Sequence, residues 1–131
     1  MITMITNFTN DPEFNSPLPH TVKPGATNEP EIVFADVANR RRVRAARQDG
    51  TQIFCHDSKD GLKPPKEPLP SEGSGRYNLY VETIHKNGVD WNPCKGKYVQ
   101  NEPFNKDIRW EDYGGDNNFN DVITVISTTS R

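Results

Sequence analysis

Short apolar stretches that alternate with polar residues, and end at turn residues, constrain the fold of this chain more than any other feature. In the segment 76–85, RYNLYVETIH, every second residue falls on one face of an extended strand: Tyr77, Leu79, Val81 and Thr83. No segment of the chain shows a convincing helical period. The pattern therefore predicts an all-β protein built from antiparallel strands.

Further strands are predicted where β-branched and aromatic residues gather between turn signals. The turn signal Gln48-Asp49-Gly50 separates two of them, and the segment 89–110 is ambiguous apart from one short stretch. Strands of this length, with turn signals about every ten residues, are typical of a β-sandwich. The predicted strands span 31–38, 42–46, 51–55, 96–100 and 121–128.

Length and composition predict one domain with long polar loops. The chain has 131 residues, of which 32% are hydrophobic, together with 11 prolines and 9 glycines. Residues 1–29 are rich in Asn, Pro and Thr, so we expect an extended polar arm there, outside the core of a domain spanning 30–131. Residues 57–75 are expected to form a long loop.

Nothing in the sequence resembles a membrane span or a secretory signal peptide. No apolar run approaches the roughly 18 residues of a spanning helix, and the start, MITMITNFTNDPEF, lacks a basic segment followed by a long apolar one. We therefore expect a cytoplasmic protein without membrane insertion, or one exported by a route that needs no signal peptide. Cys55 and Cys94 are too few for a disulfide scaffold, and we favour free thiols over a pair.

The segment 111–121, EDYGGDNNFND, concentrates side-chain oxygen atoms to a degree that a plain surface turn does not need. Oxygen is the ligand that Ca²⁺ prefers, whereas Zn²⁺ would require His or Cys. The EF-hand pattern fails, because a strand follows the loop instead of a helix. The alternative is a loop whose Asn and Asp side chains cap their own backbone. The candidate calcium ligands here are Glu111, Asp112, Asp116, Asn118, Asn120 and Asp121.

This loop and its surroundings resemble the soluble bacterial lectins that bind fucose and mannose through two adjacent calcium ions. The family's acidic loop, followed by a β-branched strand, corresponds to EDYGGDNNFNDVITVIS. An early asparagine that ligates calcium in the family corresponds to Asn39 in VANRRR, and GSGRYNLYVETIHKNG resembles the family's hairpin region. The family chain ends ten residues after the last loop aspartate, as Arg131 follows Asp121 here.

The resemblance implies an antiparallel sandwich of about nine strands of Greek-key type, forming a homodimer or a larger homo-oligomer. It implies two Ca²⁺ per chain, or one, because Asn118 stands where the family has a bridging aspartate. Asn39 would join the loop ligands, and the Arg131 carboxylate would reach the partner's site. The sugar would be fucose or mannose, or a more polar or anionic one, because arginines replace small pocket residues. The implied sugar-binding residues are Arg40, Arg41, Arg42, Asp116, Asn118 and Asp121.

Three other functions were weighed against a lectin. The run RRRVRAAR could contact phosphates, but the net charge of −2 disfavours nucleic acid as a partner. Carboxylates held by calcium make poor general acids, so we expect no enzyme activity. The strongest alternative is a calcium-stabilised structural or adhesion module that binds no sugar.

Overall fold

The structure is a computed structural model that describes residues 9–35, 39–70, 75–84, 89–102, 105–112 and 121–129. Within these ranges it contains antiparallel strands and one 3₁₀ helix, η1 (Ser58–Asp60), which confirms the predicted all-β class. No helix in the described ranges is long and apolar enough to cross a membrane. The strands are β1 (Phe14–Asn15), β2 (Leu18–Thr21), β3 (Thr27–Asn28), β4 (Glu31–Phe34), β5 (Arg41–Arg47), β6 (Gln52–Asp57), β7 (Leu69–Pro70), β8 (Arg76–Ile84), β9 (Trp91–Pro93), β10 (Lys95–Asn101), β11 (Asn105–Glu111) and β12 (Val122–Thr129).

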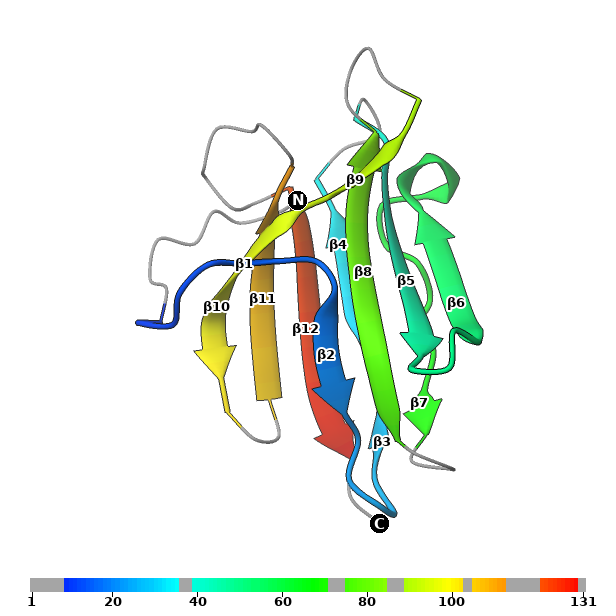
Figure 1. The fold of residues 1–131 in the computed structure, drawn as a ribbon, viewed down its shortest axis with the longest axis vertical. Coiled ribbons are helices and arrows are strands. Elements are labelled where there is room, and N and C mark those ends of the chain that lie inside the picture. Colours follow the sequence, from blue (N-terminus) through cyan, green and yellow to red (C-terminus); the bar gives the residue numbers. More distant parts are fainter. Residues whose placement is uncertain are drawn as a thin grey trace.

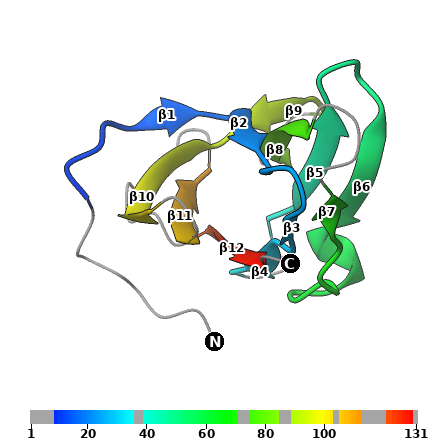
Figure 2. The same cartoon turned by 90° about the horizontal axis from the view of Figure 1, so that it is seen from below.

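The strands form two sheets that face each other (Figures 1 and 2). One sheet has the order β1-β10-β11-β12-β3-β7, with β4 also paired to β12; the other has the order β2-β8-β5-β6, with β9 paired to β8. Apolar residues from both sheets form one core cluster between them. The described residues contain twelve strands, against the nine expected, and three of the twelve are only two residues long.

The centre of the second sheet follows the sequence pattern closely. Tyr77, Leu79, Val81 and Thr83 of β8 are all buried, as their alternation predicts. The predicted turn between β5 and β6 is also present, and Gly50 adopts a φ of 94° there. That left-handed conformation is readily available to glycine, which explains the turn signal in the sequence.

The N-terminal segment is extended as expected, but its described part does not lie outside the core. β1 pairs with β10 in one sheet and β2 pairs with β8 in the other, so the segment joins the two layers (Figure 2). Leu18, Val22 and Ala26 are buried in the core cluster. The segment needs few apolar residues to pack in the core, because the longer strands supply most of the apolar surface there. The polar composition of 1–29 therefore misled the prediction.

The position of β11 determines where the oxygen-rich loop lies. All of β11 except Glu111 falls within the segment 89–110 that the sequence left ambiguous, because charged residues interrupt its apolar pattern: Lys106, Asp107 and Arg109. It pairs with β12 along its length, so the two residues that flank the loop, Asp112 and Asp121, lie at one end of the sandwich. β5 starts at the same end, the upper one in Figure 1.

Candidate functional site

The oxygen-rich loop is closed at its base by its two flanking aspartates. The Asp121 N–H donates to the carbonyl of Trp110 (3.0 Å), and the Asp112 N–H donates to Asp121 Oδ2 (3.0 Å). These two hydrogen bonds hold the end of β11 beside the residue that precedes β12, where the loop begins and ends. Residues 113–120 lie outside the described residues, and with them the predicted ligands Asp116, Asn118 and Asn120; Arg131 lies outside them as well.

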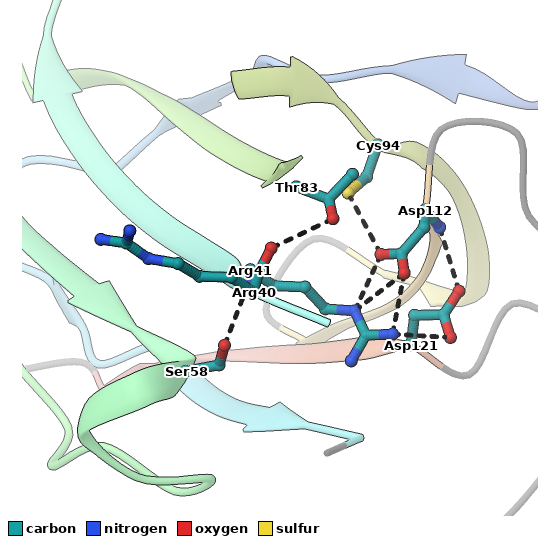
Figure 3. A network of polar contacts seen from close by, with 7 residues as sticks. All are labelled: Arg40, Arg41, Ser58, Thr83, Cys94, Asp112 and Asp121. Atoms are coloured by element: carbon teal, nitrogen blue, oxygen red, sulfur yellow. Dashed lines mark hydrogen bonds and ion pairs between the residues drawn. The ribbon is translucent and has the colours of Figure 1, made fainter. Parts of the chain in front are cut away.

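The guanidinium group of Arg41 lies against this base. Arg41 Nε donates to Asp112 Oδ1 (2.8 Å) and Oδ2 (3.0 Å), and Nη2 donates to Asp112 Oδ2 (2.8 Å) and Asp121 Oδ1 (3.3 Å). Figure 3 shows the side chain reaching across from the start of β5 to both carboxylates. The structure thus brings the segment after Asn39 to the two ends of the oxygen-rich loop, although Arg41 and Asp121 are 80 positions apart.

The start of β5 is held so that Arg41 must point inward. The Arg41 N–H donates to Ser58 Oγ (2.9 Å), and the Arg40 carbonyl accepts from Thr83 Oγ1 (3.1 Å) and from the Ile84 N–H (3.1 Å). The Arg41 side chain is only 1% exposed, against 16% for Asp112 and 18% for Asp121. A guanidinium buried this deeply requires paired carboxylates, because an isolated charge there would lose its hydration.

A buried thiol borders the same group. Cys94 Sγ lies 4.0 Å from Asp112 Oδ1, and the side chain is fully buried. Burial, followed by the negative charge of Asp112, raises the pKa of Cys94 far above its ordinary value. The sulfur therefore stays a neutral thiol that can donate weakly to the carboxylate. Cys55 is exposed, and both cysteines are free, as favoured from the sequence.

The three consecutive arginines do not share one environment. Arg41 faces the loop base, whereas Arg40 pairs with Asp57 (2.7 Å) and Arg42 with Glu82 (2.9 Å) on the outer face of the sheet. Figure 3 shows the side chains of Arg40 and Arg41 pointing in opposite directions. This follows from strand geometry, because successive side chains point to opposite faces.

The remaining described candidates are Asn39 and Glu111. Asn39 is exposed and precedes β5 by two positions, while Glu111, the last residue of β11, is fully buried. Sequence reasoning did not find Ser58, Thr83 or Cys94 as members of this group. A single Ser, Thr or Cys carries no positional signal. These three converge because β5 pairs with both β6 and β8, and because Cys94 follows β9, which also pairs with β8.

The described part of the site already holds a cation of its own. All four carboxylate oxygens of Asp112 and Asp121 accept hydrogen bonds, three from Arg41 and one from the Asp112 N–H. Among the described residues, no group of three or more His, Cys, Asp or Glu is arranged to hold a metal ion. The oxygen chemistry of these carboxylates fits Ca²⁺, but an ion that uses them must share them with the guanidinium or displace it.

A separate cavity of about 330 Å³ lies along β4. Charged and proline residues from the loop 63–66 form one wall, and β4 forms the other. None of the predicted site residues lines it. The lining residues are Glu31, Ile32, Val33, Lys63, Pro64, Pro65 and Lys66.

Comparison with solved structures relates this fold to a lectin domain. The chain is similar to the C-terminal domain of BC2L-C Lectin from Burkholderia cenocepacia, with a TM-score of 0.61 and 18% sequence identity. The match covers 90% of this chain and 99% of that one. At this level of identity the likeness establishes a lectin-like fold. No protein-family model matches the sequence, and no curated protein matches it.

Proposed function

We propose that this protein binds carbohydrate, at the end of the sandwich where the 111–121 loop meets the start of β5. The observation that carries the proposal is the contact of Arg41 with both Asp112 and Asp121. It brings the segment 39–41 to the base of the oxygen-rich loop, which is the convergence that the lectin resemblance requires. The similarity to a lectin domain supports the same reading, because the site lies on a lectin-like fold.

Calcium is the proposed cofactor, held by oxygen atoms of the loop and of Asn39. Its chemical contribution would be to coordinate vicinal sugar hydroxyls in place of bound water. The residues of this chain have separate tasks. Asp121 and Asp112 supply charged oxygens at the base of the loop, and Arg41 fixes the position of both carboxylates.

Arg41 favours one calcium ion per chain over two. Its guanidinium contacts three of the four carboxylate oxygens at the loop base, so a second ion has no uncommitted carboxylate there.

The identity of the sugar and the oligomeric state belong to the same proposal. Fucose and mannose are the first candidates from the resemblance. A homodimer or larger homo-oligomer would allow the Arg131 carboxylate to complete a partner's site, and calcium binding would then favour association. Sedimentation with and without calcium measures that coupling.

The proposal is tested by binding the purified protein to a glycan array in calcium and again in EDTA. We expect specific glycans to be bound in calcium and released in EDTA. Asp121→Asn should lose this binding, because it removes a charged oxygen at the loop base. Asp107→Asn is the matched control: Asp107 also binds an arginine, Arg109 at 2.8 Å, and its side chain is 19% exposed, but it lies within β11.

Two results would contradict the proposal in different ways. Binding of no glycan, together with a large loss of thermal stability in EDTA, would indicate the structural module. Equal glycan binding by Asp121→Asn and wild type would place the sugar site elsewhere on the molecule.

A further inference from the structure

The outer face of the second sheet carries a pair of arginines that is separate from the loop base. Arg42 and Arg44 are two positions apart on β5, so both point away from the core. Opposite them on β8 lie Glu82 and Tyr80, which are their direct partners in the strand register. Trp91 of β9 completes the group.

Each of the two guanidinium groups is fixed in two ways. Arg42 Nε and Arg44 Nε both donate to the same atom, Glu82 Oε1, at 2.9 Å. The Arg42 guanidinium carbon lies 4.0 Å from the ring centre of Trp91, and that of Arg44 lies 3.9 Å from the ring centre of Tyr80. Cation–π contact and the shared carboxylate together restrict both side chains, so little entropy remains to be lost on binding a ligand.

Both guanidinium groups keep unused donors that solvent can reach. Their Nη groups make no hydrogen bond to any described residue, and the side chains are 25% and 27% exposed. Glu82 balances only one of the two positive charges. Burial acts to raise the pKa of Glu82, but the hydrogen bonds and positive charges of Arg44 and Arg42 together outweigh burial and hold that pKa below its ordinary value. The group therefore carries one net positive charge at neutral pH.

The geometry points to an anion-binding site on this face, made by Arg42 and Arg44, for a carboxylate or sulfate group carried on a saccharide. Two fixed guanidinium groups offer several N–H donors to the oxygen atoms of a carboxylate or a sulfate, which accept more than one hydrogen bond. The choice of a saccharide as carrier rests on the proposed carbohydrate-binding function.

A nucleic acid fits this face less well than an acidic sugar. A guanidinium group already lies over a face of Trp91 and over a face of Tyr80, so those faces are not open to stacking by bases. A polyphosphate would also require several cations in a row. Beside this pair, Arg40 is neutralised by Asp57. A single anionic substituent needs only the local charge that is present.

The inference is tested by calorimetric titration with an oligogalacturonate, which carries carboxylates, and a heparin oligosaccharide, which carries mainly sulfates. A neutral dextran oligomer and a single-stranded DNA of equal length serve as comparison ligands, and all titrations are run in EDTA. We expect at least one acidic saccharide to bind more tightly than dextran and DNA. The pair of acidic ligands shows whether carboxylate or sulfate is preferred.

Three variants identify the residues responsible. Arg42→Gln/Arg44→Gln should weaken binding at least about ten-fold, the loss expected for charge-assisted hydrogen bonds. Lys63→Gln/Lys66→Gln removes the same charge beside β4 and should change affinity by less than about two-fold. Arg42→Lys/Arg44→Lys keeps both charges, does not leave Glu82 without a cation, and should still weaken binding because it removes the planar forks.

The inference is overturned if wild type binds neither acidic saccharide, or if it binds DNA as tightly as the acidic saccharides. It is also overturned if Lys63→Gln/Lys66→Gln loses as much affinity as Arg42→Gln/Arg44→Gln. Because EDTA is present throughout, these outcomes are independent of the calcium site. A protein that fails this test but binds array glycans in calcium would keep its proposed function and lose only the second site.

Discussion

Arg41 and Asp112 form a two-pronged ion pair across 71 positions of the sequence, and the same guanidinium group reaches Asp121. The pair joins the two sheets, because Arg41 begins β5 and Asp112 follows β11. It therefore has two consequences. It fixes the base of the oxygen-rich loop, and it places a positive charge where the resemblance leads us to expect calcium.

Arg41→Gln should destabilise the folded protein substantially. The change leaves two partly buried aspartates close together without their cation, a loss that costs about 3 kcal/mol or more of unfolding free energy. Chemical denaturation measures it. Arg40→Gln is the control, because its pair with Asp57 lies on the surface and should contribute little. Equal midpoints for Arg41→Gln and wild type would mean that the pair does not hold the loop base.

Leu18→Ala tests whether the N-terminal segment belongs to the core. Leu18 of β2 is 6% exposed and packs in the core cluster, so its truncation should cost about 2–5 kcal/mol of unfolding free energy. Thr21→Ala changes an exposed residue of the same strand and should be nearly neutral. If Leu18→Ala were as stable as wild type, the N-terminal segment would be an arm outside the core.

His20 should make the protein less stable as the pH falls below the ordinary pKa of histidine. Burial, which outweighs a hydrogen bond with Asn28, lowers the pKa of His20 beneath 6.5. The folded state then binds fewer protons than the unfolded state between the two pKa values, so stability is complete above about pH 6.5 and falls as the pH drops towards the folded pKa. Melting temperatures from pH 8 to 5 should decline less in His20→Gln than in wild type. Parallel curves would contradict this assignment.

Sequence reasoning succeeded where a local pattern alone determines the structure. The alternation in β8 and the glycine turn before β6 are set by neighbouring residues. It failed where a segment derives its structure from distant partners. β1, β2 and β3 pair with strands far along the chain, and their polar residues give no local signal.

The same distinction applies to the candidate site. The 111–121 loop stood out by composition, and its closure by Asp112 and Asp121 is consistent with a built site. The run of three arginines suggested one shared role, but strand alternation sends Arg41 inward and its neighbours outward. Which of them faces inward depends on the register of β5 against β8, and that register is set by packing across the core.

The central claim is that the loop end of the sandwich is a calcium-dependent ligand site in which Arg41 supplies part of the positive charge. Calorimetric titration of calcium into metal-free wild-type protein tests it most directly, by counting the ions bound per chain. We predict one ion, and none for Asp121→Asn, with Asp107→Asn behaving like wild type. Two ions per wild-type chain would show that Arg41 does not take the place of one. No calcium binding at all would contradict the account of this site.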